Sequence, residues 1–264
     1  YPLRRQRQMC IRDRNRKELF KKNDLKKQLS TDVAIQSINA TSVSEARNSA
    51  KVPSDIDWLI FCDDDGYMEE NYVNLLQRSM ANKSHINIFA GSIIRDDNHH
   101  FYSIRQQKGG DINQFMNTKL LMGSNFVIRK QTFDSLNRFD SDFGTGAKWG
   151  SGEETDFAWK AYFNREKMYY CSDLIVYHPK PYSGPLKESI KKAHRYGIGK
   201  GALVSKWLFK EKKIVVLYEF LEMMIVPFLK IIKGILFLNP KTIFVSFSSL
   251  LGRLQGMWRY LSGT

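Results

Sequence analysis

Apolar runs and helically spaced apolar positions alternate along the middle of the chain. The runs Trp58–Cys62 and Ile86–Ile94 are bounded by turn residues and predict buried strands, and Met116–Arg129 also suits a strand. Between the first two runs, Glu69–Ala81 places apolar residues near helical spacing, and a further helix is predicted over Glu154–Phe163. Strands that alternate with helices predict an α/β sheet, which binds ligands at the carboxyl ends of its strands.

The carboxyl-terminal third has a different pattern. Ile214–Phe237 is strongly apolar, and its charged residues fall within about 80° of one another around a helix, which leaves a broad apolar face. These charged residues are Glu219, Glu222, Lys230 and Lys233, and they predict one solvent-facing side. The longest uncharged runs, Met223–Leu229 and Thr242–Gly252, are shorter than the ~20 residues that span a bilayer.

Two interpretations suit these carboxyl-terminal segments: helices that lie on a membrane, or a helical hairpin packed on the rest of the protein. Pro227 is expected to kink the first helix in either case. Basic residues flank the apolar stretches and favour anionic lipid, so residues 206–264 are predicted to associate with a membrane surface. The flanking residues are Lys206, Lys210, Lys212, Lys213, Lys241, Arg253 and Arg259.

The amino-terminal end is strongly basic. Residues 1–28 hold eleven Lys and Arg against three Asp and Glu, which is +8 of the formal +14 of the chain. Little apolar periodicity accompanies this charge, so the segment predicts a solvated or disordered tail, and Tyr1–Arg14 reads as a translated artefact. Basic tails also bind nucleic acid, but only Tyr1 and Phe20 interleave the charges, so no nucleic-acid partner is predicted.

The composition is that of a globular protein. The 264 residues, 42% of them hydrophobic, suffice for one large domain or a domain with an appendage. The predicted division is a tail over residues 1–28, an α/β domain over 29–205 and the helical region over 206–264. Three scattered cysteines exclude a disulfide framework and a zinc knuckle, and they suit a reducing compartment.

Three consecutive carboxylates, Asp63, Asp64 and Asp65, follow the predicted strand that ends at Cys62. They repel one another unless a cation lies among them, and Mg²⁺ or Mn²⁺ takes oxygen ligands and bridges to substrate phosphates. The run therefore favours a metal–diphosphate site, and a solvated Asp-rich turn is the other reading. A second predicted strand ends at His178, a candidate further ligand.

A glycine-rich loop, Phe143–Gly152, leads into the acidic cluster Glu153, Glu154 and Asp156 at a predicted helix start. The helix dipole favours acids in a first turn. An open loop followed by paired acids also suits a general base that faces a bulky polar substrate. Farther on, the basic and glycine-rich Lys191–Gly201 reads either as a loop that closes over a diphosphate through Arg195, or as a flexible linker.

Several motifs from about Ser42 to Gly201 together resemble the family 2 glycosyltransferases of the GT-A fold. In chain order they are Ala46-Arg47-Asn48, Cys62-Asp63-Asp64-Asp65-Gly66, Gly123-Ser124-Asn125-Phe126, Asn137-Arg138-Phe139-Asp140, Gly152-Glu153-Glu154-Thr155-Asp156 and Tyr177-His178-Pro179. Their order over about 160 residues carries the resemblance. The fold it implies is a Rossmann-like mixed sheet with flanking helices.

The resemblance implies an inverting transferase that moves a sugar from a nucleotide-diphospho-sugar to a glycan or lipid-linked acceptor in polysaccharide biosynthesis. Asp63, Asp65 and His178 would hold Mg²⁺ or Mn²⁺, and Arg47, Asp63, Asp64 and Arg195 would contact the donor. Glu154 would be the base, Glu153 and Asp156 would orient the helix start or acceptor, and Gly123, Ser124 and Asn125 would shape the acceptor cleft. The expected location is the cytoplasmic face of the cell membrane.

The chain departs from the family pattern in two places. Glu154 stands where the family usually has aspartate, which lengthens the expected base by one methylene. Nothing before Asp63 matches the first family strand with its Pro-x-Tyr/Phe-Asn turn, so the chain reads as truncated at its amino end. Two alternatives stay open: a non-catalytic fragment that binds membranes or polyanions, and a metal-dependent nucleotidyl or phosphoryl transferase.

Overall fold

A computed structural model describes residues 36, 38–103, 108–179 and 184–264. These residues form two compact units, and each is described by itself. The first, called the sheet unit, comprises the described parts of Tyr1–Thr41, Glu45–Arg138 and Phe157–Pro181. The second, called the helical unit, comprises those of Ser42–Ser44, Phe139–Asp156 and Tyr182–Thr264.

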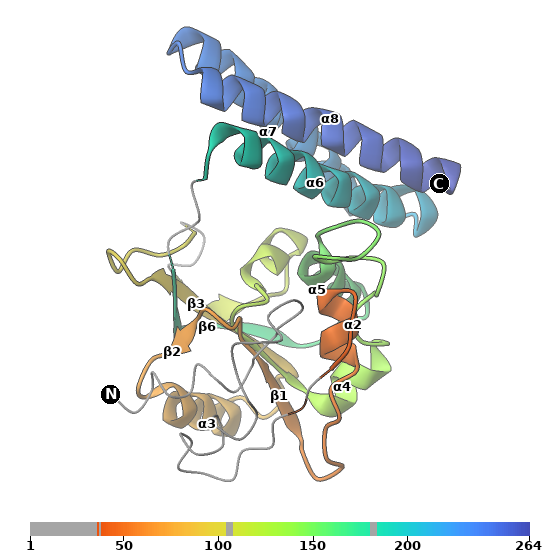
Figure 1. Ribbon diagram of the computed structural model, residues 1–264. Coiled ribbons are helices and arrows are strands. Elements are labelled where there is room, and N and C mark those ends of the chain that lie inside the picture. Colours follow the sequence, from red (N-terminus) through yellow and green to blue (C-terminus); the bar gives the residue numbers. More distant parts are fainter. Residues whose placement is uncertain (1–35, 37, 104–107, 180–183) are drawn as a thin grey trace. The chain divides into compact units, whose positions relative to one another are not determined.

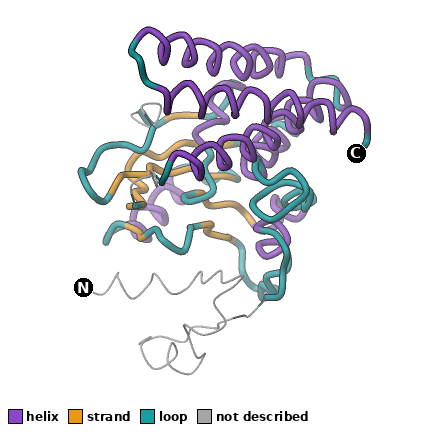
Figure 2. Tube along the Cα trace, turned by 45° about the horizontal axis from the view of Figure 1, so that its top comes forward, coloured by secondary structure: helices purple, strands orange, loops and turns teal. Residues whose placement is uncertain are grey.

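The sheet unit contains a six-stranded mixed sheet of order β1-β5-β3-β6-β2, with β4 also paired to β6. In the part of the chain that the structure describes, β3 and β6 pair in parallel and the other pairs of this sheet are antiparallel. Figure 1 labels most of these strands, and Figure 2 draws them in orange. Their bounds are β1 Trp58–Phe61, β2 Tyr67–Met68, β3 Ile88–Arg95, β4 Gly110–Asp111, β5 Phe126–Arg129 and β6 Met168–His178.

The central strand β3 is buried along its first six residues, as an apolar run without alternation predicts. Its partner β6 begins at Met168 and ends at His178, where the sequence predicted the end of a strand. The register between the two strands shifts after Gly91, which pairs with Cys171, while Ser92 pairs with Ile175. This bulge in β6 keeps the carboxyl ends of both strands together, so that Arg95 lies opposite His178.

Helices flank the sheet. The helix α3, Tyr72–Asn82, confirms the helical spacing, and its Tyr72 and Leu76 pack into a buried cluster with β3, β5 and β6. The remaining helices of this region are α2 Val43–Asn48, α4 Lys130–Ser135 and α5 Glu153–Phe163. This mixed α/β arrangement is the fold class predicted from the sequence.

One predicted strand is wrong over its first half. Met116–Arg129 overlaps a 3-10 helix, Phe115–Leu120, and only the last four residues of the predicted strand form β5. The hydroxyl of Thr118 donates to the carbonyl of Phe115 at 2.6 Å, which closes this tight turn. Phe115 packs on Trp159, so the helix buries its apolar side without joining the sheet.

The helical unit is built on three long helices that run side by side (Figure 2). They are α6 Leu186–Ser205, α7 Leu217–Leu236 and α8 Pro240–Ser262, with a π-helix Lys206–Lys210 and a 3-10 helix Ile214–Val216 between the first two. Helix α8 packs against both α6 and α7. The boundary predicted at residue 205 stays a prediction, and the contacts group α6 with the helices that follow it.

The glycine-rich segment Lys191–Gly201 was predicted as a loop or linker, and this is wrong because it lies inside α6. Its glycines allow backbone contact with α8. A Cβ on Gly201 would lie 2.0 Å from the carbonyl oxygen of Arg253, and one on Gly256 would lie 2.1 Å from that of Ile198. The glycines are therefore packing residues of a helix pair.

Helix α8 begins and ends as its sequence indicates. The side chain of Asn239 accepts a hydrogen bond from the backbone N–H of Thr242 at 3.0 Å, and Pro240 occupies the first turn. Gly263 ends the helix in the left-handed conformation, with φ of 76°. Among the described residues, no helix is long and apolar enough to cross a membrane.

Candidate functional site

The candidate site lies at the turn between β1 and β2 in the sheet unit. Asp63, Asp64 and Asp65 follow β1, and Gly66 closes the turn with a backbone hydrogen bond to the carbonyl of Asp63 at 3.2 Å. The short strand β2 pairs Tyr67 with Tyr177. In this antiparallel register, the residues before Tyr67 lie beside the residue after Tyr177, which is His178.

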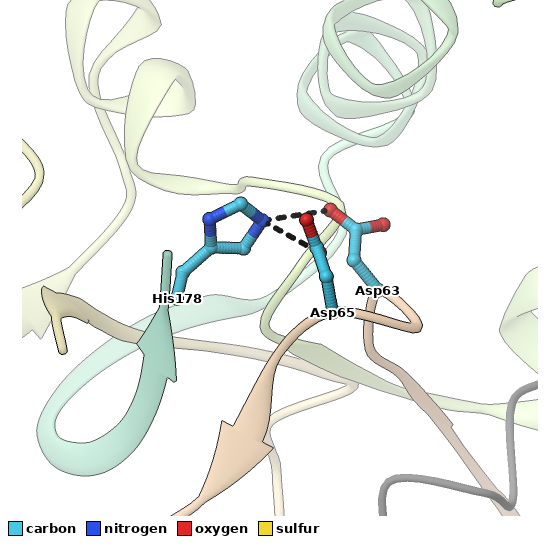
Figure 3. Close-up of side chains that lie close together, drawn as sticks. All are labelled: Asp63, Asp65 and His178. Carbon is cyan, nitrogen blue, oxygen red and sulfur yellow. Dashed lines mark ion pairs between the residues drawn. The ribbon is translucent and has the colours of Figure 1, made fainter. Parts of the chain in front are cut away.

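Three side chains meet there, as Figure 3 shows. Nε2 of His178 lies 3.1 Å from Oδ1 of Asp65 and 3.7 Å from Oδ2 of Asp63. One candidate ligand atom from each residue lies within 4.8 Å of the others. The sequence predicted these three residues as metal ligands, and the structure brings them together.

The charges of the cluster are coupled. Hydrogen bonds to the carboxylates of Asp63 and Asp65 raise the pKa of His178 to about 10, against the opposing effect of burial. The same contact with His178 lowers the pKa of Asp65, although burial opposes this shift too. Nδ1 of His178 lies 3.0 Å from the carbonyl oxygen of Pro179, which fixes the ring. The imidazole ring of His178 thus carries positive charge between the two carboxylates.

This donor set fits a hard divalent cation. Two carboxylates supply oxygen ligands, and an imidazole held by a backbone carbonyl is a common further ligand. All three side chains are partly exposed, with Asp65 the most accessible, so a ligand can reach them from solvent. Asp64 is exposed on the same turn and is not in the cluster.

Two further residues contact the cluster. The guanidinium of Arg47, on α2, lies 3.2 Å from Oδ1 of Asp63. The ring of Tyr102 meets His178 edge to face, with 5.3 Å between ring centroids. The sequence predicted Arg47 as a contact of the donor. It gave no indication of Tyr102, because Tyr102 lies in a polar segment without apolar periodicity.

Arg47 also lines a cavity of about 320 Å³ beside β1. Its walls combine aromatic side chains with three cationic ones and one carboxylate. The lining side chains that bear on recognition are Trp58, Phe61, Phe133, Arg47, Lys130, Arg138 and Asp134. Asp134 pairs with both Arg138, at 2.8 Å, and Lys130, at 3.5 Å. The cavity therefore keeps a net positive lining that begins at the carboxylate cluster.

The residues predicted to shape an acceptor cleft, Gly123, Ser124 and Asn125, are all buried. The amide of Asn125 donates to the carbonyls of Ser92 at 2.7 Å and Leu174 at 2.8 Å. Its oxygen accepts a hydrogen bond from the hydroxyl of Tyr72 at 2.7 Å. Asn125 thus joins β3, β6 and α3, and an acceptor role for the three residues stays a prediction.

The acidic cluster lies at the start of α5, in the helical unit. Glu153 is buried and Glu154 is half-buried. The preceding glycine-rich loop is hydrogen-bonded: the hydroxyl of Ser44 donates to the carbonyl of Phe143 at 2.6 Å. Gly144 has φ of 107°, and a Cβ there would lie 3.1 Å from the carboxyl carbon of Glu153. Gly144 therefore leaves space for the carboxylate of Glu153, in addition to the flexibility that the sequence predicted for the loop.

Asp156 is fully buried in the helical unit. Its Oδ1 accepts hydrogen bonds from Nζ of Lys206 at 2.7 Å and from Nε1 of Trp207 at 2.7 Å. Lys206 also contacts Asp140 at 2.8 Å. Burial lowers the pKa of Lys206, but the two carboxylates outweigh it and raise that pKa.

One assignment changes with this geometry. Lys206 was predicted as a basic flank facing a membrane, and this is wrong because it is bound inside the helical unit. Asp156 holds the start of α5, which suits the predicted orienting role. Arg195 lies exposed on α6, and its side chain packs against Gly150 of the glycine-rich loop. Its contact with a diphosphate stays a prediction.

Comparisons with known proteins support the fold. No protein-family model matches the chain, and no curated protein matches it in sequence. A crystal structure of Staphylococcus aureus TarS, a glycosyltransferase, matches with a TM-score of 0.51 and 14% identity over 76% of this chain and 34% of TarS. The chain thus spans about a third of that structure.

A second structure, residues 1–349 of S. aureus TarS in complex with UDP-GlcNAc, matches with a TM-score of 0.47 and 12% identity. This alignment covers 92% of this chain and 78% of that one. At these identities the likeness concerns the fold. The mixed sheet with flanking helices is the fold class that the sequence predicted, and the TarS structure matched at a TM-score of 0.51 shares this fold.

Proposed function

We propose that this chain belongs to a metal-dependent glycosyltransferase that uses a nucleotide-diphospho-sugar donor and inverts the anomeric centre. The observation that carries the proposal is the cluster of Asp63, Asp65 and His178 beside a cationic cavity, with Arg47 shared by both. Fold alone does not define an activity, so these side chains, and not the fold, point to the function.

Asp63, Asp65 and His178 would hold Mg²⁺ or Mn²⁺. When bound, the cation supplies positive charge that stabilises a diphosphate leaving group. The protein's own part is to keep two carboxylates within reach of one imidazole and to hold Asp63 in place through Arg47. Asp64, exposed on the same turn, would contact the donor.

The cavity beside β1 would take the nucleotide. Its volume of about 320 Å³ is at the lower end of small-molecule sites. The cations Arg47, Lys130 and Arg138 suit phosphate, and the rings of Trp58 and Phe61 offer flat faces for a base. TarS, which shares the fold, has been crystallised with UDP-GlcNAc and with UDP, and this fits a nucleotide-sugar donor.

Glu154 would remove the proton from the acceptor hydroxyl as that oxygen attacks the anomeric carbon. Glu154 is more exposed than Glu153, which favours it as the base that meets substrate. Glu153, buried against Gly144, would orient the helix start together with Asp156. A glycan or a lipid-linked sugar at the cytoplasmic face of a membrane is the proposed acceptor.

The products of donor turnover test this function. The chain is incubated with a panel of nucleotide sugars and Mn²⁺, and its products are separated by anion exchange. Glycosyl transfer or hydrolysis breaks the bond to the anomeric carbon and releases the nucleoside diphosphate. Nucleotidyl transfer breaks a phosphate bond and releases the sugar 1-phosphate, which would replace this proposal with the phosphoryl-transfer alternative.

Metal-dependent donor binding is measured on the same chain by calorimetry. Asp65→Asn is expected to weaken Mn²⁺ binding by at least about tenfold, because an amide cannot supply the charge that holds a hard cation. Asp173→Asn is the matched control, since Asp173 is an exposed aspartate on β6 outside the cluster. Equal Mn²⁺ affinity in both variants, or donor binding that ignores the metal, would contradict the proposal.

A further inference from the structure

The helices α7 and α8 each present a continuous apolar face to solvent. We propose that these two faces together form a docking surface for a bilayer that contains anionic lipid. On α7 the exposed apolar residues are Leu217, Tyr218, Leu221, Ile225, Phe228, Leu229, Ile232, Ile235 and Leu236. On α8 they are Phe244, Phe247, Leu251, Leu254, Trp258 and Leu261. This interaction surface is independent of the proposed sugar transfer.

The positions of these residues define narrow faces. At 100° per residue, the nine on α7 fall within about 120° and the six on α8 within about 100°. None of the fifteen is charged. Phe228 is 56% exposed and Trp258 is 66% exposed, far more than core side chains of this size. An uncharged apolar face of this extent marks an interaction site.

The other sides of both helices already pack within the helical unit. Gly252 and Gly256 of α8 contact the backbone of α6, and Met223 and Pro227 of α7 are buried. Glu219 is 1% exposed and pairs with Lys200 of α6 at 2.5 Å. The solvent-facing stripe predicted from the sequence is therefore wrong for Glu219, because that side of α7 faces α6 and α8.

This packing leaves the apolar faces as the outward sides of a firmly joined helix layer. The guanidinium of Arg253 on α8 donates to the backbone carbonyl of Met223 on α7, which ties the two helices together. Neither helix is long and apolar enough to span a bilayer, so the layer would lie in the plane of the membrane.

Charge complementarity identifies the occupant as anionic lipid. Without Lys206, which is bound inside the helical unit, residues 207–264 contain eight Lys and Arg against three Asp and Glu, and Asn239–Thr264 contains no acid. The exposed lysines that accompany the faces are Lys210, Lys212, Lys230, Lys233 and Lys241. Basic residues beside an apolar face attract anionic headgroups, and Trp258 and Tyr218 suit the headgroup level. A second copy of the chain would bring like charges together.

Co-sedimentation of the full chain with vesicles tests the surface. One set of vesicles is phosphatidylcholine alone, and the other also contains phosphatidylglycerol. The chain is expected to sediment with the anionic set. Salt should release it, because salt screens the attraction between the lysines and the anionic headgroups. Truncation before α7 is a poor test, since it would strip α8 from the glycine face of α6.

Two groups of substitutions separate the contribution of the apolar residues to vesicle binding from that of the lysines. The triple variant Phe228→Gln, Leu229→Gln and Trp258→Gln is expected to reduce partitioning by at least about tenfold on anionic vesicles. Lys230→Gln with Lys233→Gln is expected to reduce partitioning on the anionic vesicles alone and to weaken the dependence of that partitioning on salt. Val73→Gln is the control, because Val73 on α3 is 48% exposed and lies outside the surface.

Circular dichroism confirms that each variant is folded. A folded triple variant that sediments like the parent chain overturns the proposal, as does a parent chain that ignores both vesicle sets. Sedimentation velocity without lipid tests whether a second copy of the chain covers this surface instead. A stable dimer that the triple variant abolishes, without vesicle binding by the parent, would assign the surface to a second copy and overturn the lipid proposal.

Discussion

Replacing Gly256 with alanine tests whether backbone contact between α6 and α8 holds the helical unit together. Helix propensity alone predicts that Gly256→Ala stabilises α8 by about 1 kcal/mol. The structure predicts the opposite. The new Cβ would lie 2.1 Å from the carbonyl oxygen of Ile198 and 2.8 Å from its carbonyl carbon. Both atoms belong to the backbone, so no side chain can rotate away.

The size of the effect follows from these distances. Ordinary contact begins near 3.4 Å, so α8 must move by more than an ångström from α6. Overpacking of this kind costs about 1–3 kcal/mol. After the gain in propensity of about 1 kcal/mol is subtracted, the expected loss in the free energy of unfolding is up to about 2 kcal/mol. A chain of this size should then melt up to about 8 °C lower.

Urea unfolding followed by far-ultraviolet circular dichroism and tryptophan fluorescence measures this loss. Gln255→Ala is the control, because Gln255 is exposed on the same helix and its replacement changes propensity without contact. Gly201→Ala should behave like Gly256→Ala, since its Cβ would lie 2.0 Å from the carbonyl oxygen of Arg253. Stabilisation by about 1 kcal/mol in either glycine variant would refute the close packing.

Three further substitutions follow from the contacts. Asn125→Ala should destabilise the chain by about 2–4 kcal/mol in urea unfolding, because Tyr72 and two backbone carbonyls lose a buried partner; the exposed Asn98→Ala should change little. Lys206→Met should cost about 3–5 kcal/mol in the same assay, since it leaves the buried carboxylate of Asp156 without its cation, and an unchanged midpoint would contradict that pairing. Glu154→Gln should cut donor turnover by roughly 10²–10⁴ with little change in donor affinity, and full activity in this variant with loss in Glu153→Gln would assign the base to Glu153.

The metal cluster could be predicted from the sequence because an apolar run that stops at polar residues marks the end of a strand. Asp63 and Asp65 follow an apolar run directly, and His178 ends another. The register that brings them together, Tyr67 opposite Tyr177, carries no local signal, since β2 is only two residues long. The sequence therefore indicated the ligands without their distances.

The errors share a physical cause: local composition does not reveal burial. The glycine-rich composition of Lys191–Gly201 suggested a loop or linker, but helix packing, with Gly197 and Gly201 against α8, outweighed the low helix propensity of glycine. Lys206 looked like a surface lysine because its partner Asp140 is distant in sequence. The matching spacing of Gly252 and Gly256 was the available signal for a close helix pair.

The anomalous scattering of Mn²⁺ in crystals grown with a nucleotide sugar tests the metal-dependent transferase most directly. The proposal predicts one strong peak between the carboxylates of Asp63 and Asp65 and the ring of His178, with the donor diphosphate on the same ion. The nucleotide should extend from there into the cavity beside β1. A donor bound elsewhere, or bound at this cavity with no manganese peak at the three side chains, would contradict the proposal.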